Sequence, residues 1–259
     1  MANAREIAGR IGIELVNLTS AVAKKAAELY RAVDPDVMRH IVQLPLLSYT
    51  LFVSRRQEIE PLPSDGFPPL IFVHGLGGDR GNFLPMALYL SFKGRNRSYR
   101  IHFEKGQSIT NMADALAQFI KDVKAVTGEE VVEIVAHSLG GIVARLALAN
   151  NDMGKSVNTL ITLGSPHKGT YAARYANTPV LRDIRPDSKL VKRLNETPLP
   201  TNIKLFSFWS KNDLLVLPPE SAIMDESIPV NMTPFTHYSY LISPKCWRKV
   251  AEALEGKIN

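Results

Sequence analysis

From residue 70 to the C-terminus, short apolar runs alternate with segments of helical periodicity, and this alternation constrains the fold most strongly. The apolar runs cover residues 70–73, 99–103, 131–136, 157–163 and 203–209, and the helical patterns cover residues 81–93, 112–123, 142–149 and 244–255. Strands that are apolar along their whole length and separated by helices are typical of a parallel sheet buried on both faces. We therefore predict an α/β fold with a mostly parallel central sheet of about six strands and helices on both faces.

The first 60 residues do not follow this alternation. Apolar residues at positions 7, 11, 15, 18, 22, 26, 29 and 33 recur every three or four residues, which predicts a long amphipathic helix. Asp34 and Pro35 are typical of the start of a second helix. We predict a helical extension over residues 1–60 and an α/β domain over residues 61–259. The extension could cover the site as a lid, lie on a membrane surface or pack as structural helices, which is the role we favour.

Composition and charge exclude several classes of function. The chain has 259 residues and a net charge of +6, but no run of five like charges and no nucleic-acid-binding motif. Cys246 is the only cysteine, so an intramolecular disulfide and a cysteine-based metal site are excluded, and we expect its thiol to be buried. No set of histidines and acids has the spacing of metal ligands. We predict no metal, no cofactor and no nucleic-acid partner.

Targeting signals are absent from the sequence as given. No segment has the 18 or so consecutive apolar residues that a spanning helix requires, and the N-terminus lacks the pattern of a secretory signal. These features predict a cytoplasmic protein. Peripheral membrane contact through the N-terminal helices stays open, and the sequence does not indicate an oligomeric state.

The strongest chemical signal is the segment Ala-His-Ser-Leu-Gly-Gly at residues 136–141. It follows a predicted strand and opens a predicted helix. A serine at such a sharp strand-to-helix turn has its hydroxyl exposed above the sheet, and small neighbours are needed because the turn is tight. Ala136 stands where the usual pattern has glycine. We predict that Ser138 is a nucleophile and that the N–H of Leu139, at the helix N-terminus, faces the oxyanion.

A glycine-rich loop follows the first predicted strand, with the sequence His-Gly-Leu-Gly-Gly at residues 74–78. Glycines let a backbone donor approach a substrate closely, as an oxyanion hole requires. The loop lacks the spacing of a dinucleotide or phosphate loop. We predict that Leu76 supplies the second N–H donor, and that His74 holds the loop by hydrogen bonds.

A nucleophilic serine needs a base and an acid that orients the base. In strand-to-helix serine sites both follow the nucleophile, and only His167 and His237 lie after Ser138. No acid after a core strand lies between Ser138 and His167, so His237 is the predicted base.

The acid is expected just after a late strand. Asp213 follows the apolar run 203–209 and is the predicted orienting acid, with Asp225, Glu220 and Glu226 as the alternatives.

Five motifs in this order resemble the lipase and esterase branch of the α/β-hydrolases. The motifs are the two above, then Gly-Ser-Pro-His-Lys-Gly-Thr at 164–170, Asn-Asp-Leu-Leu-Val at 212–216 and Thr-His-Tyr at 236–238. The chain is similar over residues 68–256 to small bacterial triacylglycerol lipases and to acyl hydrolases related to the glycosylphosphatidylinositol deacylases. The resemblance implies an α/β-hydrolase fold and hydrolysis of carboxylic esters, with lipid-like substrates, through an acyl-enzyme and without a cofactor.

The resemblance also implies that the segment after residue 167 lines the substrate pocket. We therefore expect residues 171–200 to form a small cap, and His137, His167 and Tyr171 to contact the substrate. Two other functions stay open. An acyltransferase or thioesterase could use the same three residues, and a protein that only binds ligands could have the same fold.

Overall fold

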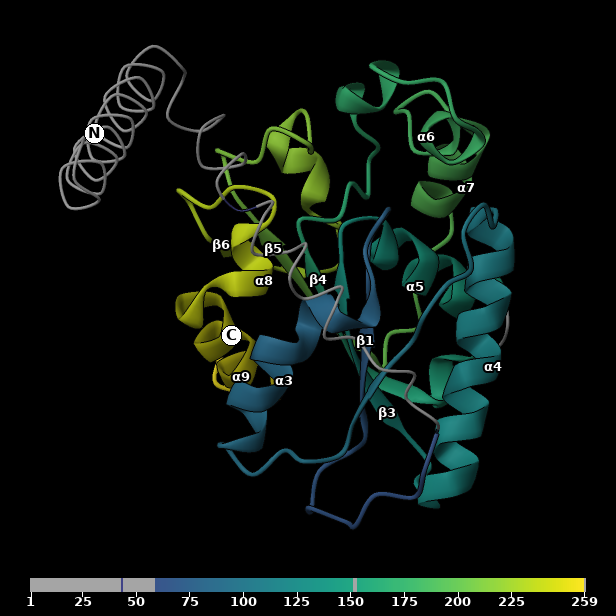
Figure 1. Ribbon diagram of the computed structural model, residues 1–259. Coiled ribbons are helices and arrows are strands. Elements are labelled where there is room, and N and C mark those ends of the chain that lie inside the picture. The colour runs from purple at the N-terminus through teal and green to yellow at the C-terminus, as the bar shows by residue number, and fades with distance from the viewer. Residues whose placement is uncertain (1–42, 44–58, 151–152, 259) are drawn as a thin grey trace, which may run out of the picture. The chain divides into compact units, whose positions relative to one another are not determined.

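The computed structural model describes residue 43, residues 59–150 and residues 153–258 (Figure 1). In this part of the chain, six strands form one sheet, and every neighbouring pair is parallel. In spatial order the strands are β2 (Ser98–Arg100), β1 (Leu70–Val73), β3 (Val132–His137), β4 (Val157–Leu163), β5 (Lys204–Trp209) and β6 (Ile228–Asn231). The predicted parallel sheet of about six strands is therefore confirmed.

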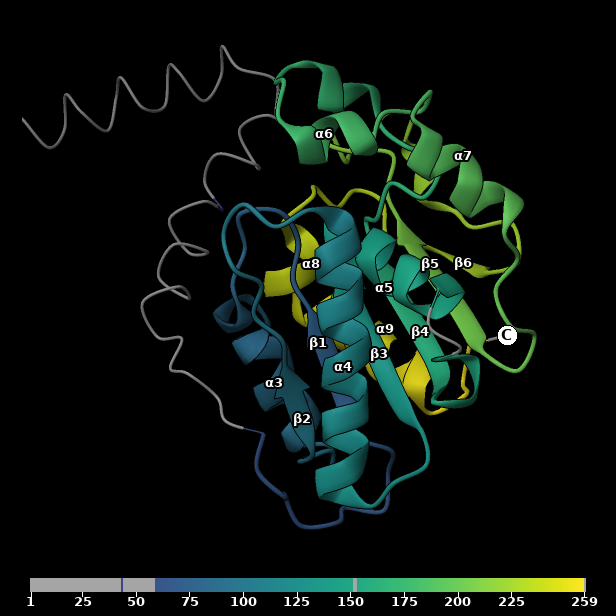
Figure 2. The same ribbon diagram turned by 90° about the vertical axis from the view of Figure 1, so that its right-hand side faces the viewer.

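Helices cover both faces of this sheet (Figure 2). They are α3 (Leu84–Ser91), α4 (Ile109–Thr127), α5 (Leu139–Asn150), α6 (Pro179–Asp183), α7 (Lys189–Glu196), α8 (Ser239–Ile242) and α9 (Pro244–Leu254). Short 3-10 helices lie at Arg80–Phe83, Met153–Lys155, Tyr171–Arg174 and Pro219–Ala222. α4 and α5 pack together against one face, while α3, α8 and α9 pack against the other.

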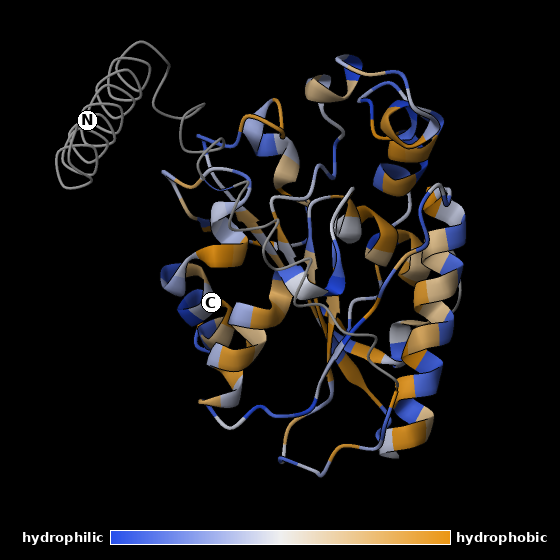
Figure 3. Ribbon diagram, viewed as in Figure 1, coloured by the Kyte–Doolittle hydropathy of each residue, from blue (hydrophilic) through white to orange (hydrophobic). Residues whose placement is uncertain are grey.

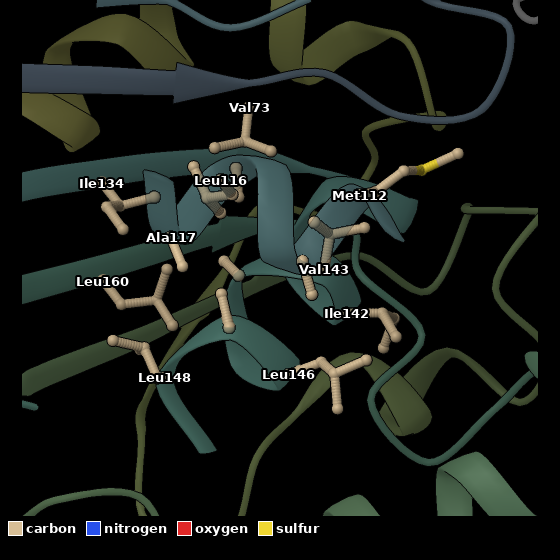
Figure 4. Close-up of a cluster of buried hydrophobic side chains, with 14 of the residues drawn as sticks. Val73, Met112, Leu116, Ala117, Ile134, Ile142, Val143, Leu146, Leu148 and Leu160 are labelled. Atoms are coloured by element: carbon tan, nitrogen blue, oxygen red, sulfur yellow. The ribbon is translucent and has the colours of Figure 1, made fainter. Parts of the chain in front are cut away.

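The strand side chains alternate between two hydrophobic clusters. In β1, Ile71 and Val73 join the cluster under α4 and α5, whereas Leu70 and Phe72 join the cluster under α3, α8 and α9. Because successive residues of a strand point to opposite faces, a strand buried on both faces must be apolar throughout. Figure 4 shows the first cluster, in which side chains of α4 and α5 meet those of β1, β3 and β4.

Local signals explain where α4 begins and ends. The hydroxyl of Ser108 accepts a hydrogen bond from the N–H of Asn111 at 3.2 Å, which caps the start of the helix. Gly128 ends the helix with a φ of +71°, a conformation that favours glycine. The helix predicted from the pattern over residues 112–123 is confirmed, and it extends beyond that pattern at both ends.

Two predicted segments have different bounds in the structure, and one strand was not predicted. Each difference has a physical reason. The predicted strand over residues 99–103 ends at Arg100, because the N–H of Phe103 donates to the His74 ring and not to a strand partner. The predicted helix over residues 81–93 is divided, since a 3-10 turn precedes α3. β6 was not predicted because it contains Pro229. An edge strand tolerates proline because one side of its backbone needs no partner.

The remaining expectations concern the cap, the N-terminal extension and Cys246. Residues 171–200, the predicted cap, hold a 3-10 helix, α6 and α7, which follow β4 at the carboxyl edge of the sheet. The helical extension predicted for residues 1–60 lies outside the described residues except at positions 43, 59 and 60. Cys246 is buried, as expected, and burial raises the pKa of its thiol.

A buried ion pair lies at the opposite, amino edge of the sheet. The Arg95 guanidinium donates to the carboxylate of Glu133, on β3, and to the carbonyl oxygen of Leu254 at 3.3 Å. Arg95 is 6% and Glu133 4% exposed. Burial raises the pKa of Glu133, and the charge of Arg95 opposes that rise.

We expect Glu133→Ala to lower the free energy of unfolding by about 3 to 5 kcal/mol, because it removes the carboxylate that balances the buried Arg95 charge. Chemical denaturation measures this change. Glu129→Ala is the matched control, since Glu129 also pairs with an arginine but its side chain is 37% exposed. That control should cost no more than about 1 kcal/mol. Equal, small losses in the two variants would contradict the expectation.

Candidate functional site

Ser138 lies at the sharp turn between β3 and α5. Its φ is +55°, and no other non-glycine residue in the described part of the chain has a positive φ. The turn is held by the Ser138 N–H, which donates to the carbonyl of Leu163 at 2.9 Å, and by the Ser138 carbonyl, which accepts from Gly141 at 3.1 Å. Backbone strain of this kind persists only where the surroundings impose it, and it is typical of a nucleophile turn.

Three predicted residues, far apart in sequence, meet at this turn. The His237 Nε2 atom lies 2.8 Å from the Ser138 hydroxyl oxygen, and His237 Nδ1 lies 3.0 and 2.9 Å from the two carboxylate oxygens of Asp213. His237 and Asp213 are 3% and 1% exposed. With the proton on Nδ1, the ring donates to the carboxylate and accepts the serine hydroxyl, which is the arrangement of a serine nucleophile with its base and acid.

The alternative acids lie in other segments. Asp225 is exposed and accepts a hydrogen bond from Lys168 at 2.6 Å. Glu220 lies in the 3-10 helix 219–222, and Glu226 in the turn before β6. The structure therefore brings together Asp213, and not its rivals, with the predicted base.

Glycines around the turn are required by close approach. A Cβ on Gly75 would lie 2.8 Å from the Ser138 Cβ, and a Cβ on Gly140 would lie 2.5 Å from the carbonyl oxygen of Val73. A Cβ on Gly164 would lie 2.8 Å from an Asp213 carboxylate oxygen. Real Cβ atoms do not approach so closely. The segments after β1, β3 and β4 can therefore pack together only with glycine at these three positions.

The two predicted oxyanion donors lie beside Ser138. Leu76 and Leu139 line the same cavity as the serine. Leu139 is the first residue of α5, so its N–H belongs to the positive end of the helix dipole. Their role as donors stays a prediction.

His74 holds the glycine loop, as the sequence predicted. Its Nδ1 lies 2.9 Å from the carbonyl oxygen of Gly75, and its Nε2 accepts the N–H of Phe103 at 3.3 Å. This pair of bonds needs a neutral ring, because one nitrogen must donate and the other accept. Burial lowers the pKa of His74 and so favours that neutral form.

His137, one residue before Ser138, bonds to the backbone of His237. It was expected to contact substrate, and it does line the cavity, but it is only 4% exposed. Its Nε2 lies 2.9 Å from the backbone carbonyl oxygen of His237, to which it donates, and the two rings are 4.7 Å apart. Burial lowers the pKa of His137 to about 3, so the ring is a neutral donor. This ring nitrogen is therefore bonded to the His237 backbone.

Two other expected substrate contacts are not on the cavity wall. His167 is fully buried, and its Nε2 lies 3.0 Å from the hydroxyl of Thr162; burial lowers the pKa of this ring well below its usual value. The Tyr171 side chain is 52% exposed and does not line the cavity; the Arg174 guanidinium lies 5.2 Å from its ring centre. The nearby Tyr175 lines the cavity instead.

The cavity has a volume of about 560 Å³ and mostly apolar walls. Its wall comes from the glycine loop, the cap and the loop after β5, through residues such as Phe83, Leu181, Ile184, Leu214 and Val216. An apolar cavity with few polar groups at one place suits a substrate with a hydrocarbon portion. The residues at 214–216 were noted in the sequence only as neighbours of Asp213.

The described residues contain neither a metal site nor a helix that could span a membrane. No group of three or more histidine, cysteine or acidic side chains could hold a metal ion. None of the helices in that part of the chain combines the length and the hydropathy needed to cross a membrane.

Comparisons with known proteins identify the family and the fold of the chain. A family model described as "PGAP1-like alpha/beta domain" matches residues 86–250, which is more than half of the chain. GPI inositol-deacylase from Kluyveromyces lactis is 34% identical over 103 residues, which cover 39% of this chain and 10% of that protein. GPI inositol-deacylase from Candida albicans is 23% identical over 252 residues, which cover 80% of this chain and 59% of that protein. The chain thus spans less than two thirds of the length of these relatives.

Solved lipase structures share the fold. Lipase B from Aspergillus fumigatus superposes with a TM-score of 0.64 at 17% identity, over 74% of this chain and 53% of that one. The mature lipase BlEst2 from Bacillus licheniformis gives a TM-score of 0.64 at 16% identity, over 75% of this chain and 95% of that one. Identities this low establish the α/β-hydrolase fold alone. Together with the family match, they show that the chain belongs to the family of PGAP1-like alpha/beta domains, within the α/β-hydrolase superfamily.

Proposed function

We propose that this protein is a serine hydrolase that cleaves carboxylic esters of lipid-like substrates through an acyl-enzyme. The observation that carries the proposal is the hydrogen-bonded row Ser138–His237–Asp213 at the wall of an apolar cavity of about 560 Å³. The relatives named GPI inositol-deacylase support an acyl group as the unit that is removed.

The first half of the reaction forms the acyl-enzyme. His237 Nε2 takes the hydroxyl proton of Ser138 as Oγ bonds to the ester carbonyl carbon, and the carbonyl π electrons move to its oxygen. The N–H groups of Leu76 and Leu139 hold that oxyanion. Asp213 keeps the proton on Nδ1 and stabilises the imidazolium. The C–O bond to the leaving alcohol then breaks, and the alcohol takes the proton from Nε2.

The second half of the reaction regenerates the free enzyme. Water gives a proton to His237 and attacks the acyl carbon, and the Ser138 oxygen leaves and recovers that proton. A thioesterase would differ only in the leaving group, and an acyltransferase only in the acceptor that replaces water.

The acyl portion would lie along the cap in this proposal. Leu181 and Ile184 of the cap line the cavity together with the loop 214–216. These side chains offer hydrocarbon contact and no charge, so longer acyl chains gain more binding free energy than short ones.

We expect Ser138→Ala to lower kcat for p-nitrophenyl esters by at least about 10⁴-fold without unfolding the protein, because no other group can form the acyl-enzyme. Turnover and labelling by a fluorophosphonate probe, located by peptide mass spectrometry, measure this. Ser91→Ala, on α3, is the control and should keep full activity. Full turnover in Ser138→Ala would contradict the proposal, and a folded wild-type protein with no turnover at any chain length would favour a ligand-binding role.

The bond from His137 to the His237 backbone predicts a positioning role. We expect His137→Leu to lower kcat by about 10- to 100-fold at nearly unchanged KM, because the base loses its support while the cavity keeps its shape. His137→Gln should recover most of this loss, since the amide N–H can still donate. A fall in KM and kcat together, with no recovery by Gln, would contradict the role. Thermal denaturation of both variants excludes unfolding as the cause.

The position of Leu181 predicts a change in chain-length preference. We expect Leu181→Trp to lower kcat/KM for p-nitrophenyl palmitate at least about tenfold relative to the acetate, because the larger ring fills part of the cavity. Leu181→Ile, of equal volume, is the control and should keep the original preference. An unchanged ratio of palmitate to acetate in Leu181→Trp would place the acyl chain elsewhere.

A further inference from the structure

Large exposed hydrophobic side chains gather around the cavity mouth. Six large hydrophobic side chains are exposed among the described residues. Three of them line the cavity: Leu76 at 53%, Tyr175 at 90% and Leu215 at 41%. A fourth, Tyr171 at 52%, belongs to the same 3-10 turn region as Tyr175. We call these four residues the rim.

The rim comes from three separate segments. Leu76 lies in the loop after β1, the two tyrosines lie after β4, and Leu215 lies after β5. Because all strands are parallel, these segments meet at the carboxyl edge of the sheet, above which α6 and α7 lie (Figures 1 and 2). Apolar side chains exposed together on a soluble domain mark an interaction surface.

Basic residues accompany the rim. Residues 171–196 hold six basic residues and three acidic ones, so this tenth of the chain carries half of the net charge of +6. Arg174, Arg182, Lys189 and Lys192 are exposed, and hydrophilic and hydrophobic residues alternate along α6 and α7 (Figure 3). The buried side of α7 holds Val191 and Leu194, which leaves its lysines on the outer side.

We propose that the rim and these four basic residues dock onto the surface of an anionic lipid bilayer. Tyrosine suits this position, since its ring enters the acyl boundary while its hydroxyl stays in the headgroup layer. The guanidinium of Arg174, over the Tyr171 ring, would sit at the same depth beside lipid phosphates. Long lysine side chains reach such a surface from the cap.

The positive charge of the cap and the apolar cavity both favour a lipid bilayer as the partner. The apolar rim is continuous with the apolar cavity that leads to Ser138, so an acyl chain can pass from the membrane without crossing water. The passage of an acyl chain to Ser138 rests on the proposed function. The surplus of basic residues in residues 171–196 does not depend on it. Acidic residues moderate the attraction: Asp187 lies 3.5 Å from Arg174, and Asp183 and Glu196 lie in the cap. Because the attraction between the basic residues and the anionic bilayer is electrostatic, binding should weaken as salt is added.

The test is co-sedimentation of the full chain, as Ser138→Ala so that no lipid is consumed, with vesicles of pure phosphatidylcholine and of phosphatidylcholine with about 30% phosphatidylserine. We expect at least about tenfold stronger partitioning onto the anionic vesicles. The charge reversal Lys189→Glu with Lys192→Glu should remove most of this difference, and Tyr175→Ser should weaken binding to both vesicles.

The matched control is Lys155→Glu with Lys204→Glu. Both lysines are exposed; Lys155 precedes β4 and Lys204 is the first residue of β5. They therefore lie at the amino edge of the sheet and carry the same charge change on the far side. Partitioning of the control should stay within about twofold of the parent. Equal loss in the two double variants would show a non-specific charge effect and overturn the proposal, as would equal binding to both vesicles or no effect of Tyr175→Ser.

Failure of docking can be told from failure of the proposed function. The double variant Lys189→Glu with Lys192→Glu, with Ser138 intact, should hydrolyse p-nitrophenyl acetate in solution at the parent rate, because neither lysine lines the cavity. Loss of vesicle binding with this rate retained supports docking. A parent protein without esterase turnover that still partitions onto anionic vesicles would reject the proposed function and keep the docking surface.

Discussion

The close packing of three loops around one strained residue is the constraint on which the site depends. Ser138 holds a positive φ only because its N–H and carbonyl are both bonded and because neighbouring loops approach without side chains. The parallel sheet makes this approach possible, since it delivers the loops after β1, β3 and β4 to the same edge. The hydroxyl oxygen is thereby placed 2.8 Å from His237 Nε2.

Buried histidines illustrate how that packing sets chemistry. His74 and His137 each donate one ring hydrogen to a backbone carbonyl, and desolvation lowers the pKa of both. A cation at residue 137 would repel the imidazolium that forms 4.7 Å away on His237 during the proposed reaction. Burial thus supplies a rigid donor without a competing charge. These two rings act as fixed supports of the backbone, while the His237 ring bonds to the Ser138 hydroxyl.

Much of this could be predicted because the signals are local. Continuous apolar runs predicted the strands, and a serine between a strand and a helix predicted the turn at Ser138. Asp213 and His237 followed from their order in the chain. What could not be predicted depends on tertiary contacts. β6 contains Pro229 and is stabilised by pairing with β5. His167 was expected to contact substrate because of the resemblance. It is instead buried in the core, where its ring bonds to the Thr162 hydroxyl.

The cap and Ser138 are connected through one helix, α5, which begins directly after Ser138 and bonds to α7 of the cap. Arg145, on α5, is 3% exposed, and its guanidinium donates to the Leu194 carbonyl at 2.6 Å and to the Asn195 side chain at 2.9 Å. Those acceptors lie in the last turn of α7, where a cation also stabilises the helix dipole. The N-terminus of α5 follows Ser138. The wall that would hold an acyl chain is therefore tied to the helix that positions the hydroxyl, so a shift of one displaces the other.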